Sequence, residues 1–79
     1  MYQVYIIFSS KLQRFYTGIT HDFAQRLSAH NSGLSVYTAK GIPWQVKWIS
    51  EAMAKTAALR LERTIKKRGA GRYLSDMGR

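Results

Sequence analysis

The sequence predicts an α+β fold in which a three-stranded antiparallel sheet is flanked by helices. Two runs of β-branched and aromatic residues, separated by a short polar stretch, indicate a hairpin, and a third run follows the single proline. Two further segments carry apolar residues at helical spacing. Because 79 residues supply only one hydrophobic core, we treat residues 1–79 as a single domain.

The hairpin consists of two strand-like runs and the polar stretch between them, at residues 2–8, 15–19 and 9–13. Apolar residues occupy both alternating sets of positions in the first run, which is typical of a strand that is covered on both faces or lies centrally in a sheet. We expect the chain to turn at Ser10 and Lys11. That register would place Tyr5 directly opposite Tyr16, with Cβ atoms about 5 Å apart.

The first helix follows the hairpin, with Thr20 or Asp22 as its N-terminal cap and Gly33 as its end. Its inward face is indicated by spacing of i, i+4 and i+7, which is the repeat of an amphipathic helix. The residues at this spacing are Phe23, Leu27 and His30.

A polar segment, residues 35–42, is expected to form a loop, and Pro43 then introduces the third strand at residues 44–50. In this strand Trp44, Val46, Trp48 and Ser50 alternate with Gln45, Lys47 and Ile49. For both tryptophans, packing in the core is the favoured interpretation, because large aromatic rings bury well.

The second helix is predicted over residues 54–68, and its apolar stripe comprises Ala54, Ala57, Ala58, Leu61 and Ile65. Most of its cations lie off that stripe, and those in its last turns complement the helix dipole. The glycine-rich sequence at residues 69–71 should break the helix, and residues 72–77 could add one closing helical turn.

The charge of the chain indicates a polyanionic partner. Thirteen Lys and Arg against four Asp and Glu give a net charge of +9. Residues 1–39 contribute three cations and one acid, whereas residues 40–79 contribute ten and three. An imbalance of this size attracts nucleic acid, although a basic surface that serves only solubility is the simpler alternative.

Other composition features narrow the class of protein. The absence of cysteine excludes a disulfide framework and thiolate zinc sites, so we expect a cytoplasmic setting. No apolar run is long enough to span a membrane, and no signal peptide is recognisable. We therefore expect nucleic acid and no membrane as the partner.

Candidate nucleic-acid-binding residues lie in the loop and on the second helix. Aromatic, polar and cationic groups interleave near the loop, which suits contacts with backbone and bases. The loop group comprises Asn31, Tyr37, Thr38 and Lys40, and the helical group comprises Arg60, Arg63, Lys66 and Lys67. The alternatives are that Asn31 fixes a loop or caps the first helix, and that the helical cations form an ordinary solvated face.

Several short motifs occur in a recognisable order: Gln3-Val4-Tyr5, Tyr16-Thr17-Gly18, the helix from Arg26 to Asn31, Tyr37-Thr38, Pro43-Trp44, and the segment from Ala58 through Glu62 to Lys67. Together they resemble a GIY-YIG endonuclease domain over nearly the whole chain. The chain is most similar to small stand-alone bacterial members of that superfamily. It is more distantly similar to the incision domain of the excision-repair nuclease subunit and to homing endonucleases.

The resemblance implies specific roles. Tyr16 would act as the base, Tyr5 would donate a hydrogen bond that orients the phosphate, Arg26 would stabilise the transition state, His30 would relay or orient, and Glu62 would bind the metal. The implied activity is a metal-dependent endonuclease that nicks DNA in a structure- or damage-directed way during repair or recombination, with a protein partner available for targeting. Ile19 stands where some relatives carry a catalytic lysine, and Gln3 and Thr17 also depart from the motif.

The residues themselves are compatible with this chemistry. Phosphodiester hydrolysis needs a base, positive charge on the developing oxygens, and an acid or metal at the leaving oxygen. A tyrosine with a pKa near 10 is ionised only about one part in a thousand at pH 7, so it needs a nearby cation or proton acceptor. Four scattered acidic residues suit one Mg²⁺ or Mn²⁺ ion better than a two-metal site.

Structural alternatives accompany each of these roles. Tyr5 and Tyr16 could be an aromatic pair that stabilises the sheet, His30 could be a packing residue, and Glu62 could form an i, i+4 ion pair with Lys66. At the level of function, the alternatives are a nucleic-acid-binding module without catalytic activity and a protein-interaction domain with a basic surface.

Overall fold

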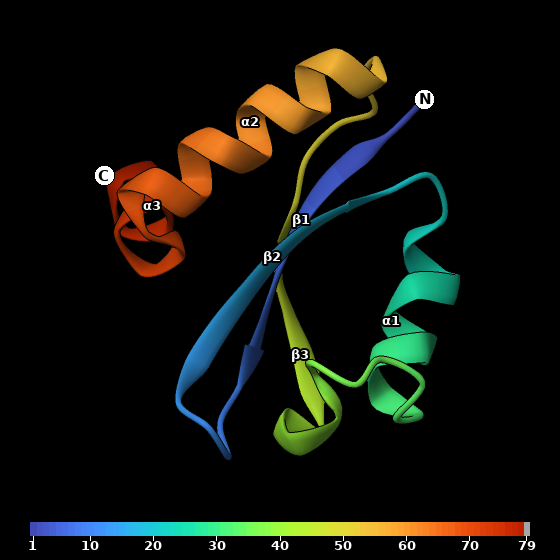
Figure 1. The fold of residues 1–79 in the computed structure, drawn as a ribbon. Coiled ribbons are helices and arrows are strands. Elements are labelled where there is room, and N and C mark those ends of the chain that lie inside the picture. Colours follow the sequence, from blue (N-terminus) through green and yellow to red (C-terminus); the bar gives the residue numbers. More distant parts are fainter. Residues whose placement is uncertain (79) are drawn as a thin grey trace.

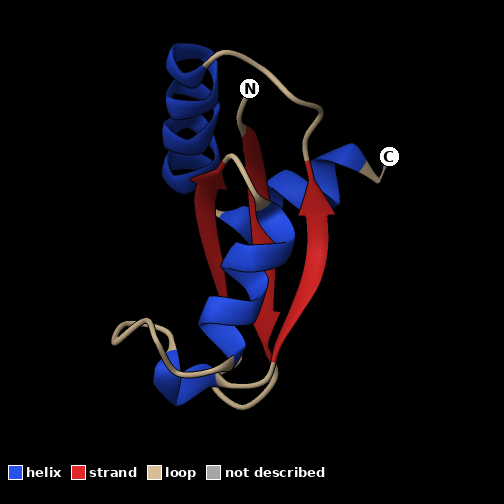
Figure 2. Ribbon diagram, turned by 90° about the vertical axis from the view of Figure 1, so that its right-hand side faces the viewer, coloured by secondary structure: helices blue, strands red, loops and turns tan. Residues whose placement is uncertain are grey.

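The computed structural model describes residues 1–78 and has the predicted α+β architecture. Its elements are β1 (Gln3–Ser9), β2 (Arg14–Thr20), α1 (Phe23–Asn31), the 3-10 helix η1 (Ala39–Gly41), β3 (Trp44–Ile49), α2 (Lys55–Arg68) and α3 (Ala70–Met77). Helix α1 covers one face of the sheet, and α2 and α3 cover the other (Figures 1 and 2). The three-stranded antiparallel sheet flanked by helices is therefore confirmed.

The central position of β1 explains its apolar sequence. The strand order is β2-β1-β3, and β1 pairs antiparallel with both neighbours. Val4 and Ile6 pack on the face covered by α2 and α3, whereas Tyr5 and Ile7 point toward α1. All four side chains are at most 1% exposed. The sheet thus separates two small cores, and β2 forms one of its edges.

The hairpin register differs from the prediction. Tyr5 pairs with Gly18, and Tyr16 pairs with Ile7, so the two tyrosines are diagonal neighbours rather than directly opposed. The turn is longer than expected because the Ser9 hydroxyl accepts a hydrogen bond from the Leu12 amide at 3.0 Å. These contacts and a left-handed residue at position 13, with φ of 55°, shift the pairing of the strands.

The boundaries of α1 agree with the capping signals. The Asp22 side chain accepts a hydrogen bond from the Gln25 amide at 3.1 Å, so Asp22 is the N-cap. Thr20 holds the N-cap residue in turn, because its hydroxyl accepts a hydrogen bond from the Asp22 amide at 3.0 Å. Beyond the helix, Gly33 has a φ of 83°, a conformation that favours glycine.

The simple alternation predicted for the third strand is wrong because β3 contains an irregularity. Ile6 pairs with Trp48 but Ile7 pairs with Val46, so one residue of β3 is left over between them. As a result Trp44 packs beside Tyr5 and Ile7, whereas Trp48 packs on the opposite face. Both tryptophans belong to the cores, as predicted.

Helix α2 matches its predicted span within one residue, but its buried stripe is narrower than expected. Ala58 and Ile65 are buried and Leu61 is half-buried, whereas Ala54 and Ala57 are exposed. The predicted break at residues 69–71 is confined to Gly69, with φ of 95°, and residues 70 and 71 already belong to α3. In the described part of the chain, no helix is long and apolar enough to cross a membrane.

Candidate active site

The position of Tyr5 depends on a glycine in the neighbouring strand. The Tyr5 ring lies across the backbone of Gly18, where an added Cβ would come 2.5 Å from the phenol oxygen. Real Cβ atoms do not approach other atoms so closely, so a side chain at position 18 would displace the ring. Gly18 is therefore what allows the Tyr5 phenol to reach across the edge strand β2.

A buried hydrogen-bonded chain holds this phenol from the other side. The Tyr5 hydroxyl is 2.9 Å from His30 Nε2, and His30 Nδ1 is 2.7 Å from the Thr38 hydroxyl. His30 is 0% exposed and Thr38 is 1% exposed. A neutral imidazole has one N–H and one bare nitrogen, so one ring nitrogen of His30 donates a hydrogen bond and the other accepts one. The hydrogen bonds that link Thr38, His30 and Tyr5 therefore all run in the same direction.

The loop that carries Thr38 is fixed by Trp44 and Asn31. The Trp44 indole N–H donates to the Thr38 carbonyl at 2.7 Å. The Asn31 side chain accepts from the Trp44 amide at 2.6 Å and donates to the Trp44 carbonyl at 3.2 Å. The backbone of β3 is thereby tied to the end of α1. Asn31 fixes a loop, which was one of its predicted alternatives.

Tyr16 and Arg26 complete the exposed side of this cluster. The Tyr16 ring is half-buried, with its centroid 5.1 Å from that of His30 and 6.4 Å from that of Tyr5. Arg26 is exposed on α1, and hydrogen bonding with the Tyr5 phenol is the main reason why the pKa of Arg26 is raised. The predicted set of Tyr5, Tyr16, Arg26 and His30 therefore meets in one place.

The environment distinguishes the protonation states of these groups. Burial raises the pKa of Tyr5; Arg26 opposes this rise by hydrogen bonding, while the nearby Tyr16 and Glu62 charges add to it. Burial also lowers the pKa of His30, and the charge of Arg26 acts in the same direction. At neutral pH, Tyr5 is thus a protonated phenol and His30 a neutral imidazole.

Glu62 lies on α2, which packs on the other face of the sheet from α1. Its side chain is 20% exposed, and its negative charge contributes to the raised pKa of Tyr5. It also pairs with Lys66 at 3.4 Å between Nζ and Oε2, so the predicted i, i+4 ion pair is present. Among residues 1–78, no group of three or more His, Cys, Asp or Glu side chains forms a ready-made metal cage.

The residues predicted to bind nucleic acid divide into two groups. Thr38 is buried against His30, and the Asn31 amide is occupied by Trp44, so these two side chains position the site rather than face a substrate. Binding of nucleic acid by Thr38 stays a prediction, and the structure adds that its hydroxyl is buried and hydrogen-bonded to His30. The remaining side chains are exposed: Tyr37, Lys40, Arg60, Arg63, Lys66 and Lys67.

This arrangement has the components of a phosphodiester hydrolase. Two phenols and a guanidinium lie together, and the charge of the Glu62 carboxylate contributes to the raised pKa of Tyr5. Hydrogen bonds or close packing fix the two tyrosines beside the edge strand β2. A polyanion could approach this edge, because the exposed charge of the chain is strongly positive. The geometry by itself is therefore consistent with a hydrolytic site for nucleic acid.

Comparison with known proteins identifies the family. The family model described as the GIY-YIG catalytic domain matches residues 1–73. Neither the comparison with curated proteins nor that with solved structures found a match. Domains of this family are generally nucleases that act on nucleic acid. The match covers nearly the whole chain and agrees with the observed α+β fold, so the protein belongs to the GIY-YIG family.

Proposed function

We propose that this protein is a metal-dependent endonuclease that hydrolyses a phosphodiester bond in one strand of DNA. The observation that supports this most strongly is the convergence of Tyr5, Tyr16 and Arg26 over the buried His30, with the charge of Glu62 acting on the same phenol. A sheet-stabilising tyrosine pair would not require an arginine and a carboxylate from two different helices.

The two tyrosines have different proposed roles. Tyr5 donates a hydrogen bond that orients the phosphate, because its raised pKa keeps the phenol protonated. Tyr16 is the more exposed of the two and acts as the base toward the attacking water. Arg26 stabilises the negative charge that develops on the phosphate oxygens, as a fixed guanidinium does in phosphoryl transfer.

Glu62 is the proposed ligand for one Mg²⁺ or Mn²⁺ ion. A hard divalent cation accepts a single protein carboxylate and fills its other positions with water and phosphate oxygens, so the sparse donor set fits. When bound, the ion would supply positive charge at the leaving oxygen. The ion pair with Lys66 compensates the charge of the carboxylate within the protein itself.

The proposed biological setting is the cytoplasm, in DNA repair or recombination. A single site of this kind cuts one strand, which suits nicking at branched or damaged DNA. Targeting would come from the structure of the substrate or from a protein partner. DNA is preferred over RNA as the substrate in this proposal.

The first experiment surveys substrates and metal ions together. Purified protein is incubated with supercoiled plasmid, branched DNA, and single-stranded DNA and RNA, with Mg²⁺, Mn²⁺ or excess chelator. Arg26→Ala and Glu62→Ala should lose cleavage, whereas Glu51→Ala, which removes an exposed carboxylate outside the cluster, should retain it. Cleavage that persists in chelator, or in both active-site variants, contradicts the proposal.

The second candidate function is a nucleic-acid-binding module without catalytic activity. Two observations favour it: Glu62 is already paired with Lys66, and Ile19 provides no cation beside the tyrosines. This candidate predicts salt-sensitive binding with no strand cleavage under any metal condition. The same survey therefore separates the two functions.

A further inference from the structure

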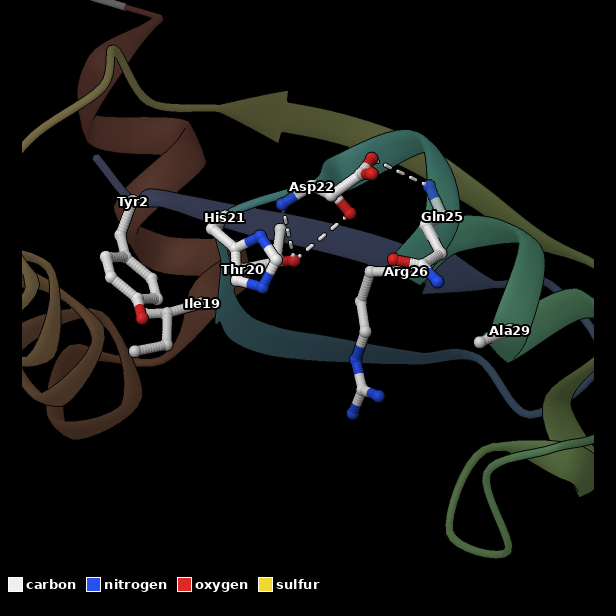
Figure 3. Close-up of a pocket in the computed structure, with 8 residues that line it drawn as sticks. All are labelled: Tyr2, Ile19, Thr20, His21, Asp22, Gln25, Arg26 and Ala29. Atoms are coloured by element: carbon white, nitrogen blue, oxygen red, sulfur yellow. Dashed lines mark hydrogen bonds between the residues drawn. The ribbon is translucent and has the colours of Figure 1, made fainter.

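A hollow beside the proposed active site has features that the nuclease chemistry does not use. It has a volume of about 400 Å³ and lies between the ends of β1 and β2 and the first turns of α1. Tyr2, His21, Gln25 and Arg26 line it, as Figure 3 shows. Arg26 is also part of the catalytic cluster, so the hollow opens directly beside the position proposed for the scissile phosphate.

Two aromatic rings form one end of the hollow. The Tyr2 and His21 rings are perpendicular, with centroids 5.9 Å apart and an interplanar angle of 87°. Tyr2 is held in place by two backbone hydrogen bonds with Met53, each 2.7 Å long. His21 is exposed, so its ring remains available to a ligand. A fixed aromatic group beside an exposed one forms a surface on which a nucleobase can stack.

Two cations lie near these rings or line the same hollow. Lys55, the first residue of α2, places its Nζ 5.8 Å from the centroid of the Tyr2 ring. Arg26 lines the hollow from α1. A nucleoside 3′,5′-bisphosphate carries a phosphate on either side of its sugar and a flat aromatic base that projects from the sugar, so cations and an aromatic ring are the groups that would bind it. The volume lies within the range of pockets that hold small ligands.

We propose that this hollow is a nucleotide subsite, which accepts the base next to the phosphate held by Arg26. The base stacks on the exposed His21 ring and meets the Tyr2 ring edge to face, the Gln25 amide offers a hydrogen bond to the edge of the base, and Lys55 contacts the phosphate on the far side. A base inside a duplex is covered by its neighbours, so the subsite favours single-stranded or distorted DNA over a regular duplex. The position next to the scissile phosphate rests on the proposed function.

The direct test compares two small ligands of equal charge, without metal and therefore without cleavage. Deoxyadenosine 3′,5′-bisphosphate and its abasic analogue, deoxyribose 3′,5′-bisphosphate, are titrated into ¹⁵N-labelled protein in chelator. We expect the base-bearing ligand to bind at least about fivefold more tightly, as one stacked base requires, and to shift the amide signals of Tyr2, His21 and Gln25. Equal affinities, or shifts confined to the α2 cations, overturn the subsite.

Variants add a second readout. His21→Ala should bring the two affinities close together, and His21→Phe should restore the preference for the base-bearing ligand. Gln25→Ala should weaken only the base-bearing ligand, whereas Gln45→Ala, which changes an exposed glutamine of β3, should change neither. A base preference that survives His21→Ala and Gln25→Ala counts against the subsite. Because no cleavage is measured, a failure of the nuclease proposal leaves these results interpretable, and cleavage without base preference would reject the subsite alone.

Discussion

At the scale of single residues, the site is built by side chains that hold other side chains. Tyr5, His30 and Thr38 form a buried chain in which each polar atom has a partner. Breaking such a chain leaves a buried group without a hydrogen bond, which costs more than the bond itself contributes. Gly18 acts by lacking a side chain, because it leaves room for the phenol. The position of Tyr5 is therefore set by its neighbours.

Thr38→Val tests the buried chain. The substitution preserves shape but removes the hydroxyl from His30 Nδ1, so the free energy of unfolding should fall by about 1 to 3 kcal/mol. Urea denaturation measures this change. Thr56→Val is the matched control, since Thr56 is exposed in α2, and it should change stability by less than about 0.5 kcal/mol. An equal loss of stability in both variants would argue against the buried hydrogen bonds of Thr38, His30 and Tyr5.

Gly18→Ala tests the placement of Tyr5. The new methyl group would meet the phenol oxygen at 2.5 Å, so either the ring or β2 must move. Overpacking of this kind costs about 1 to 3 kcal/mol, and cleavage should decrease because Tyr5 is displaced. Gly78→Ala is the control, since the nearest atoms to its added Cβ are at an ordinary 3.7 Å. Unchanged stability and cleavage in Gly18→Ala would mean that the ring position is unimportant.

At the scale of elements, α2 combines two functions. Its inner side packs Ala58 and Ile65 against the sheet, and its half-buried Glu62 contributes to the raised pKa of Tyr5. Its outer side is exposed and cationic. Periodicity predicted the span of this helix well, because the apolar repeat extends over several turns. It could not predict that Gly69 alone separates α2 from α3, since a single residue with φ of 95° suffices for the turn.

Charge reversal on the outer side of α2 tests its role in binding. Arg60→Glu combined with Arg63→Glu should weaken DNA binding and flatten the dependence of log Kd on log salt, by about 0.9 for each phosphate that the protein no longer neutralises. Fluorescence anisotropy over a series of salt concentrations measures the slope. Lys11→Glu combined with Arg14→Glu makes the same charge change at the hairpin turn and should alter the slope less. Identical slopes in wild type and the α2 variant would show that these two arginines do not bind DNA phosphates.

The hairpin shows the limit of prediction at this scale. The runs of β-branched and aromatic residues identified both strands, but the register depended on the loop at residues 10–13 and its side-chain hydrogen bonds. Such contacts involve one or two atoms and leave no periodic pattern in the sequence. The same holds for the irregularity in β3, which sends the two tryptophans to opposite faces.

In the whole molecule, the proposed site draws on distant parts of the sequence. Tyr5 comes from the central strand, Arg26 and His30 from the helix on one face, and Glu62 from the helix on the other, as the arrangement in Figure 1 allows. The motif order led to the prediction that these residues form one site, and the structure brings Tyr5, Arg26 and His30 close together. The supporting roles of Thr38, Trp44 and Gly18 depend on contacts in space, which leave no periodic signal along the chain.

Burial of His30 makes the stability of the whole fold depend on pH. Its pKa is lowered in the folded protein, mainly by burial and also by Arg26. The unfolded chain therefore takes up the proton first as the pH falls below about 6.5, the ordinary pKa of histidine, so stability is complete above that pH and decreases below it. Urea denaturation between pH 7.5 and 5 should show this loss, and His30→Gln should reduce it. A flat profile for the wild-type protein would contradict the buried neutral histidine.

The proposed cleavage of DNA depends on the cluster around Tyr5, on Glu62 and on a divalent metal ion. The most direct measurement is the rate of plasmid nicking in Mg²⁺ by Glu62→Gln, with DNA affinity measured in parallel and Glu51→Gln as the matched control. We predict that Glu62→Gln loses nicking at least about 100-fold while it binds DNA as tightly as wild type or more tightly, because a negative charge has been removed. Nicking by Glu62→Gln at the rate of Glu51→Gln would contradict the proposed role of Glu62 in metal-dependent cleavage.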